Sequence, residues 1–244
     1  MLGLMGAWTS GEVLGLDFET TGIDRFEDVP VSYALVSVVD GVLVRSWSGL
    51  IDPGREIPAD ATEVHGITTE RARAEGMPLE EAIGLVADAV VAASRRGAPL
   101  AGMKLDFDLT LLDAQAVLLG GRGLVPRGWH GPVLDAGVLD RHFDPDRHGR
   151  RTLGDLCAHY GIPFENAHDA SADAIASVQV LFALAERFEE VRGTDLGRLH
   201  AEQILWHRAW TEDMDDWRVS QGMIRMDPRD FVWPVAPAVM PPAA

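Results

Sequence analysis

Two carboxylates, Asp17 and Glu19, stand two residues apart at the end of an apolar run that begins at Val13. Residues i and i+2 of a strand point to the same face, so both acids would leave a buried strand side by side. Each charge raises the pKa of the other, and a divalent cation would relieve the repulsion. Mg²⁺ and Mn²⁺ prefer such oxygen ligands. The alternative is a solvated turn beyond the strand, and the pair alone does not decide between the two.

Two further aspartates, Asp108 and Asp173, each fall in the first turn of an expected helix. A negative charge there interacts favourably with the helix dipole, which for Asp108 alone is a better explanation than a metal site. With Asp169 as the N-cap of the second helix, His168 would stand in the preceding loop and could turn back toward Asp173. A lone histidine in a loop is usually a surface residue. None of these three residues therefore indicates a functional site alone, and only the combination does.

The elements that would position these residues begin with a hairpin and then alternate between helix and strand. Asp40 and Gly41 are a turn signal between two of the strands. We expect strands at 13–18, 31–39, 42–50 and 99–102, a helical turn at 61–68, order at 133–139, and helices at 79–90, 108–119, 152–160 and 170–188. This order predicts an α/β fold with a mixed central sheet flanked by helices.

Composition excludes several classes of protein. The chain has 244 residues, with 21 basic against 38 acidic side chains and a net charge of -17, so a broad cationic surface for extended duplex DNA is not expected. The single cysteine, Cys157, excludes an internal disulfide framework and a Cys-rich zinc site, and its apolar neighbours indicate a core position. Neither a signal peptide nor a membrane span is apparent, and we expect a cytoplasmic protein.

The amino-acid composition of the sequence changes near residue 192. We expect one domain at 1–192, a Trp-rich helical extension at 193–233, and a disordered Pro/Ala-rich tail at 234–244. Trp206, Trp210 and Trp217 fall on one helical stripe. That stripe should pack either on the chain's own first domain, which is favoured, or on a partner such as a polymerase subunit or a second copy.

Taken in order, Asp17, Glu19, Asp108, His168 and Asp173 resemble the motif set of the DEDDh, or DnaQ-like, 3′–5′ exonucleases, the family of bacterial proofreading subunits. The resemblance covers roughly residues 10–190. It rests on residues 17–22, 107–112 and 168–173, with support at 65–68, 134–135 and 152–162. It implies an RNase H-like exonuclease fold with a C-terminal helical extension.

The resemblance also implies a two-metal mechanism. Two divalent cations, Mg²⁺ or Mn²⁺, would be held by Asp17, Glu19, Asp108 and Asp173, and His168 would take the proton from the attacking water. The implied substrate contacts are Phe18, Thr20, Thr21, Gly22, His65, Lys104 and Phe107. Met103-Lys104 departs from the family's usual His-Asn pair, and Lys104 could meet a phosphate instead. Asp106 matches the motif less well than Asp108.

The implied function is release of nucleoside 5′-monophosphates from single-stranded or frayed 3′ ends, with DNA favoured over RNA, in proofreading or DNA repair. The alternatives are a catalytically silent module associated with a polymerase and an exoribonuclease that trims RNA 3′ ends. The sequence does not decide between a polymerase-bound and a free-standing nuclease. The basic loop from Arg141 to Arg151 could bind substrate phosphates, or its charges could be balanced by Asp140, Asp144 and Asp146.

Overall fold

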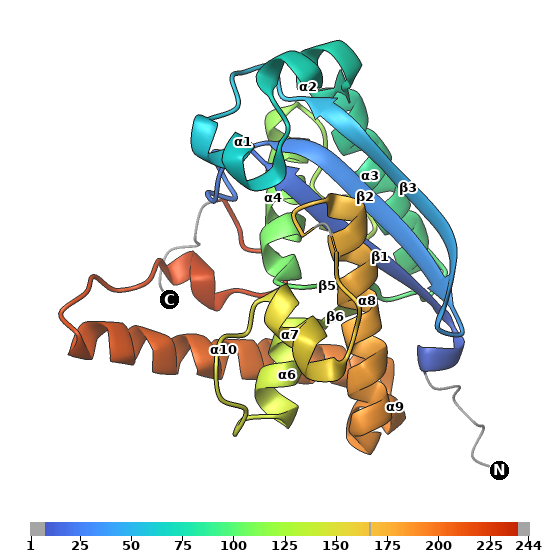
Figure 1. Cartoon of the computed structure of the whole chain (residues 1–244), viewed down its shortest axis with the longest axis vertical. Coiled ribbons are helices and arrows are strands. Elements are labelled where there is room, and N and C mark those ends of the chain that lie inside the picture. Colours follow the sequence, from blue (N-terminus) through green and yellow to red (C-terminus); the bar gives the residue numbers. More distant parts are fainter. Residues whose placement is uncertain (1–7, 166, 239–244) are drawn as a thin grey trace.

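The structure is a computed structural model that describes residues 8–165 and 167–238 (Figure 1). The strands are β1 (Glu12–Thr20), β2 (Pro30–Val39), β3 (Val42–Asp52), β4 (Met77–Pro78), β5 (Leu100–Gly102) and β6 (Val133–Asp135). The larger helices are α3 (Leu79–Arg95), α4 (Leu105–Leu118), α6 (Ala136–Phe143), α7 (Leu153–Tyr160), α8 (Ala170–Arg187) and α10 (Leu196–Ser220). Shorter ones are η1 (Trp8–Ser10), α1 (Ala59–His65), α2 (Thr69–Glu75), α5 (Leu124–Arg127), α9 (Glu189–Gly193) and η2 (Pro228–Phe231).

Within the described chain, six strands form one mixed sheet in the order β4-β3-β2-β1-β5-β6. β1, β2 and β3 are antiparallel neighbours, whereas β5 and β6 run parallel to β1. Asp40 and Gly41 both adopt left-handed backbone angles (φ 51° and 74°), which suits the tight turn between β2 and β3. The predicted α/β class, the mixed sheet and the hairpin are confirmed.

Two hydrophobic clusters lie on the two faces of the sheet. Leu14, Leu16 and Phe18 of β1 face α3 and α4, while Val13 faces α8. Because side chains alternate along a strand, Asp17 and Glu19 share the α8 face with Val13. Gly15 lies between Val13 and Asp17 on this face, where a Cβ would come within 2.8 Å of Val178 in α8. The glycine therefore lets α8 approach β1 closely, next to the acids.

Some elements differ from the expectation. The helix expected at 108–119 begins earlier, at Leu105, because Asp135 of β6 accepts a hydrogen bond from the Leu105 N–H (2.8 Å). This partner lies 30 residues away in the sequence, so no local pattern reports it. The helices α2 and α5 were not predicted. Cys157 is a buried free thiol, as expected, and none of the described helices is long and apolar enough to cross a membrane.

The C-terminal helix α10 completes the edge of the sheet. Gln203 accepts a hydrogen bond from the Asp135 N–H (2.8 Å) and donates one to the Val133 carbonyl (2.9 Å). His200 Nδ1 accepts one from the Val133 N–H (3.2 Å). Side chains of α10 thus satisfy the backbone of edge strand β6, which would otherwise expose unpaired donors and acceptors.

The tryptophan stripe of α10 is only partly covered. Trp206 stacks on His142 of α6 (ring centroids 3.7 Å apart) and Trp210 lies under the Arg141 guanidinium (4.0 Å). Trp217, by contrast, is 53% exposed, so packing of the stripe in cis holds for two of these three residues. The buried face of α10 carries a different set at a spacing of four: Leu199, Gln203, His207, Thr211 and Asp215.

The chain after α10 folds back onto the domain. Asp215 is buried, and it accepts hydrogen bonds from Arg225 (2.6 Å) and from the Met226 N–H (2.7 Å). Ala236 is 2% exposed and its N–H donates to Thr110 of α4 (2.9 Å). The expected disorder from residue 234 is therefore wrong for the packed residues up to 236, while 239–244 lie outside the described residues.

Candidate active site

The first two acids leave the C-terminal end of β1 on the face that α8 covers. Glu19 is 8% exposed and Asp17 is partly exposed, and both belong to the strand. The alternative of a solvated turn beyond the strand is therefore excluded. On the same face, α8 and the loop before it supply two further members of the predicted set, His168 and Asp173.

Asp108 reaches the same place from α4. Its carboxylate is buried, and Oδ1 accepts a hydrogen bond from the Phe18 N–H (3.0 Å), between the two acids of β1. Asp106, two residues earlier in the helix, forms an ion pair with Arg25 (3.1 Å) instead. The structure therefore brings Asp108 to the paired acids and gives Asp106 another partner.

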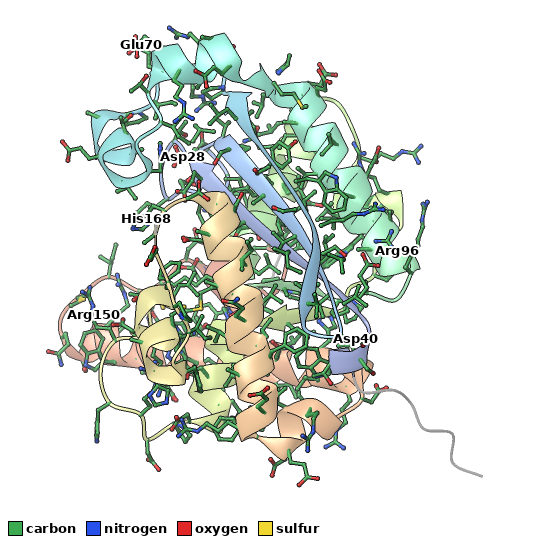
Figure 2. All side chains as sticks on the ribbon, turned by 45° about the vertical axis from the view of Figure 1, so that its right-hand side comes forward. Asp28, Asp40, Glu70, Arg96, Arg150 and His168 are labelled. Carbon is green, nitrogen blue, oxygen red and sulfur yellow. The ribbon has the colours of Figure 1, made fainter. Side chains whose placement is uncertain are left out.

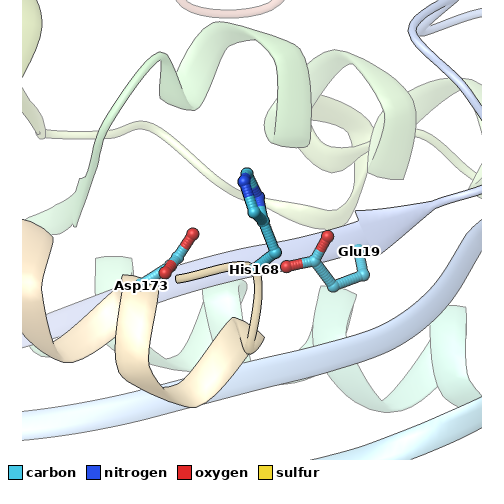
Figure 3. A group of neighbouring side chains, drawn as sticks. All are labelled: Glu19, His168 and Asp173. Carbon is cyan, nitrogen blue, oxygen red and sulfur yellow. The ribbon is translucent and has the colours of Figure 1, made fainter. Parts of the chain in front are cut away.

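His168 and Asp173 complete the cluster from the start of α8. Asp169 caps the helix by accepting a hydrogen bond from the Ala172 N–H (3.0 Å), as predicted. His168 precedes the cap in a left-handed conformation (φ 68°), which is unusual for a residue other than glycine and turns the chain back on itself. As Figure 3 shows, Glu19, His168 and Asp173 meet, with one possible ligand atom from each within 4.8 Å of the others.

The electrostatics of the cluster raise the pKa of all four carboxyls. Burial, together with the nearby Asp108 and Asp173, raises the pKa of Asp17 well above its ordinary value. Burial, followed by the charge of Asp173, raises the pKa of Glu19 to about 7. Burial also raises the pKa of Asp173 to about 6 and that of Asp108 well above its usual range. Four acids held together at this energetic cost are characteristic of a functional site.

The residues fit divalent cations. Asp173 Oδ1 is buried and has no hydrogen-bond partner among the described residues, so it is an acceptor without a donor. A bound cation would give this oxygen a partner and would favour the ionised form of the four carboxyls, against the burial and the neighbouring charges that raise their pKa values. The carboxylates Asp17, Glu19, Asp108 and Asp173 offer only oxygen, the ligand that Mg²⁺ and Mn²⁺ prefer.

The predicted substrate contacts on and after β1 have structural roles. The Phe18 side chain lies in the core on the far face of the strand. The Thr21 hydroxyl donates to Asp28 (2.7 Å) and accepts from the Val29 N–H (3.1 Å), and Thr20 donates to the Gly22 carbonyl (2.6 Å). A Cβ on Gly22 would lie 2.5 Å from the Asp28 carboxylate. These residues hold the loop that follows β1, and substrate contact is not supported for the side chains of Phe18 and Thr21.

His65 lies beside the cluster. It lines a cavity of about 230 Å³ with Glu19 and His168, and Arg71 of α2 lines the same cavity. Its Nδ1 accepts a hydrogen bond from the Ile67 N–H (3.1 Å), whereas its Nε2 is buried without a hydrogen-bond partner in the described chain. Burial lowers the pKa of His65, which favours the neutral ring. His65 therefore places a neutral imidazole ring at the edge of the cluster.

The two predicted contacts on α4 lie at its start. Lys104 is exposed and adopts a left-handed conformation (φ 58°), and Phe107 packs at the margin of the core. An exposed ammonium at this position is compatible with the predicted phosphate contact. It does not reproduce the hydrogen-bonding groups of a His-Asn pair.

Sequence reasoning missed two arginines near the site. Arg71 was missed because α2 was not predicted, although Thr68 could have indicated the helix start: its hydroxyl accepts a hydrogen bond from the Arg71 N–H (3.2 Å). Arg25 lies in the loop after β1 and contacts residues that are distant in sequence, so no local pattern marks it.

The basic loop after α6 is used mainly inside the fold. Arg147 (3.1 Å) and Arg151 both pair with Asp140, which is fully buried, and Arg187 of α8 pairs with Asp144 (3.2 Å). Arg150 remains at the margin of the molecule (Figure 2). Of the two interpretations left open, the structure favours balanced charges, with Asp140 of α6 as the partner of Arg147 and Arg151.

Comparisons with known proteins agree with this geometry. A family model described as an exonuclease, RNase_T, matches residues 14–181. The chain is 32% identical over 210 residues to a DNA polymerase III subunit epsilon-like protein of Rhodobacter capsulatus, covering 82% of this chain and 27% of that protein. It is 30% identical over 184 residues to a DNA polymerase III PolC-type protein of Latilactobacillus sakei, covering 74% and 12%. The chain thus spans a minor part of either relative.

Solved structures of exonuclease I share the fold. One matches with a TM-score of 0.64 at 20% identity, covering 81% of this chain and 44% of that chain. E. coli exonuclease I in complex with a dA16 oligonucleotide matches with a TM-score of 0.61, also at 20% identity and with the same coverage. This likeness confirms the predicted RNase H-like exonuclease fold. With more than half of its length matched by the family model, the chain belongs to the RNase_T exonuclease family.

Proposed function

We propose that the protein is a metal-dependent 3′–5′ exonuclease that releases nucleoside 5′-monophosphates from single-stranded or frayed DNA ends. The observation that carries this proposal is the convergence of Glu19, His168 and Asp173, with Asp17 and Asp108 beside them, at the end of β1. Such a set of acids with one histidine suits hydrolysis of a phosphodiester, whose charge must be neutralised before water can attack.

Each residue has a distinct role in the proposed reaction. Asp17, Glu19, Asp108 and Asp173 would hold two divalent cations, Mg²⁺ or Mn²⁺. When bound, these cations would activate water and neutralise charge on the phosphate and the leaving 3′ oxygen. His168 would accept the proton of the attacking water, and because it is exposed it can pass that proton to solvent. His65 and Lys104 are the side chains we propose for contact with the substrate.

DNA is proposed as the substrate because the relatives are named as DNA polymerase III proteins and the exonuclease I structures include complexes with DNA oligonucleotides. The polymerase III names support association with a polymerase. We propose a role in proofreading or DNA repair, as the resemblance to the DnaQ-like exonucleases implies. A polymerase subunit or a second copy would bind through the apolar side chains that remain exposed near the end of α10, Trp217 and Ile224.

A degradation assay tests the proposal. A single strand of about 20 nucleotides labelled at its 5′ end should give a ladder that shortens from the 3′ end in Mn²⁺, with 5′-mononucleotides as products, and EDTA should stop the reaction. A 3′-terminal phosphorothioate should slow it. Asp173→Asn is the matched inactive control. Release of the labelled 5′ nucleotide first, or no hydrolysis of DNA at all, would refute the proposal.

Three further substrates in the same assay separate the alternatives. RNA of the same sequence degraded faster than DNA would indicate an exoribonuclease that trims RNA ends. A duplex with a mismatched 3′ end should be degraded faster than a fully paired one, because its end frays. No degradation of DNA or RNA by a protein that binds Mn²⁺ would indicate the silent module.

A further inference from the structure

Arg25 joins three parts of the chain that meet beside the cluster of acids. It lies in the loop between β1 and β2 and its side chain is 11% exposed. Nη1 donates to Asp106 Oδ2 (3.1 Å), in the first turn of α4, and Nη2 donates to Asp230 Oδ1, in η2 of the C-terminal segment. One guanidinium thus connects the loop after Glu19, the helix that carries Asp108, and the end of the chain.

The first turn of α4 depends on such outside partners. Lys104, at its N-cap, has a left-handed backbone and makes no capping hydrogen bond through its side chain. The Leu105 N–H is instead held by Asp135, and in the described chain Arg25 is the only ion-pair partner of Asp106. The charges of His207 and Arg25 both offset the repulsion between Asp106 and Asp135. Without Arg25 less compensation would remain, and the first turn of α4, which contains Asp106, would be free to shift. Asp108 belongs to that same turn.

The loop that presents Arg25 is braced. Asp28 accepts hydrogen bonds from the Thr21 hydroxyl (2.7 Å) and the Asp24 N–H (2.9 Å), and Gly22 allows the close approach of its carboxylate. Because this loop continues directly from β1, its position is fixed relative to Asp17 and Glu19. Arg25 therefore ties α4 to the strand that carries the other acids.

The C-terminal side of the contact is also anchored. The Asp230 carbonyl accepts a hydrogen bond from Nε2 of His207, a buried residue of α10 (2.9 Å). Arg229 lies over the Phe26 ring of the same loop (4.1 Å) and pairs with Asp227 (2.6 Å). The C-terminal segment is thus fixed at the point where Arg25 binds it.

We propose that Arg25 is a positioning residue that couples the C-terminal segment to the metal-binding acids by holding the first turn of α4 against β1. This inference rests on the proposed function: its effect on metal affinity rests on the proposed metal-binding acids, and its kinetic consequence rests on the proposed hydrolysis. The two carboxylates that Arg25 binds lie outside the metal-binding set, so it acts through Asp106 and Asp230.

Arginine suits this role because its planar fork can bind two carboxylates at once, in fixed directions. Lysine presents one point charge and would keep one of the two contacts in good geometry. Residues that orient metal ligands from outside typically change metal affinity or activity by about 10–100-fold when they are replaced. Since Arg25 acts one step further away, we expect an effect near the lower limit, about tenfold.

The test measures Mn²⁺ binding to the full-length chain by electron paramagnetic resonance, with kcat on single-stranded DNA as a second measurement. Arg25→Gln should raise the Kd for Mn²⁺ about tenfold and lower kcat at saturating Mn²⁺. Arg25→Lys should recover part of both losses. Asp230→Asn should have an intermediate effect, and combined with Arg25→Gln it should add little, because both variants break the same contact.

Arg96→Gln is the matched control. Arg96 pairs with Glu12 at the start of β1, and it lies at the opposite end of the sheet from His168 (Figure 2). This variant removes one arginine ion pair at the far end of β1, so it should lower Tm slightly and leave Mn²⁺ affinity and kcat unchanged.

The proposal is overturned if Arg25→Gln lowers Tm while the Kd for Mn²⁺ and kcat equal those of the wild type, because Arg25 would then be merely structural. If Arg25→Gln does not fold, Asp230→Asn decides, and wild-type Mn²⁺ affinity in that variant overturns the proposal. A wild-type protein that binds Mn²⁺ but degrades no nucleic acid would refute the proposed function only. The comparison of Mn²⁺ affinities would still decide the role of Arg25.

Discussion

Replacing Glu19 by glutamine should make the metal-free protein more stable at pH 8, although it should abolish hydrolysis. The pKa of Glu19 is raised from 4.5 to about 7, first by burial and then by the charge of Asp173. The pKa of this acid is higher in the folded state than in the unfolded state, so ionising it lowers the free energy of unfolding. That loss reaches its full size when the pH is above the folded-state pKa of about 7. The cost shrinks as the pH falls and vanishes below 4.5, where both states are protonated.

The size of the effect follows from the same shift. The difference between 4.5 and about 7 corresponds to about 3 kcal/mol, at about 1.4 kcal/mol for each pH unit. Solvent screening of a carboxylate at the mouth of a site reduces this to about 1–2 kcal/mol. For a chain of this length that gain should raise Tm by about 3–6 °C.

Thermal unfolding in EDTA at pH 8 and pH 5 measures the effect. Glu19→Gln should raise Tm at pH 8 and change it little at pH 5. Saturating Mn²⁺ should stabilise the wild type, by about 2.7 kcal/mol at a hundredfold excess over Kd, and the variant less, because a ligand is lost.

Glu12→Gln is the control on the same strand. A hydrogen bond from Arg96 lowers the pKa of Glu12, so this variant should be slightly less stable at pH 8, the opposite sign. If Glu19→Gln also lowers Tm at pH 8 in EDTA, the acids are not a source of instability and the argument for a cation between them loses its basis.

Three further outcomes are expected. Conversion of any one of the proposed metal ligands Asp17, Asp108 and Asp173 to asparagine should nearly abolish hydrolysis with the fold intact, and an Asp108→Asn protein with wild-type activity would indicate Asp106 instead. His168→Ala should lower kcat by about 10²–10⁴-fold with little change in Mn²⁺ affinity; a loss of affinity as large as that of an aspartate variant would identify a ligand instead. Deleting residues 193–244 should lower Tm by several degrees and promote aggregation, because Gln203 satisfies edge strand β6; a deletion variant as stable and monomeric as the full chain in light scattering would contradict this.

The local sequence pattern correctly predicts the first strand, the hairpin and the helix N-cap at the site. The apolar run from Val13 predicts β1, and the two-residue spacing of Asp17 and Glu19 places both on one face. The pair Asp40-Gly41 predicts the turn, and Asp169 predicts the start of α8. These features depend on interactions within a few residues, so the sequence reports them directly.

The order and spacing of the motif residues also predict the family. What residue types and spacing could not provide was the convergence itself. Asp108 accepts a hydrogen bond from the N–H of Phe18, which is 90 residues away in the sequence. The start of α4 at Leu105 is set by a hydrogen bond to Asp135, 30 residues further along the chain. Contacts of this kind arise from packing between elements, and neither partner carries a local signal for the other.

The C-terminal segment shows the same limit most clearly. From the sequence alone, its tryptophans were the residues expected to pack, and its end was expected to be disordered. Tertiary structure packs Trp206 and Trp210 but leaves Trp217 exposed. It also buries a mostly polar row on α10, in which Gln203 satisfies backbone groups of β6, and it packs Ala236 against α4. Sequence determined the chemistry of the acids and the strand that presents them. The fold alone decided which distant side chains hold that strand and α4 together, since a hydrogen bond across the core depends on position in space and leaves no periodic trace in the chain.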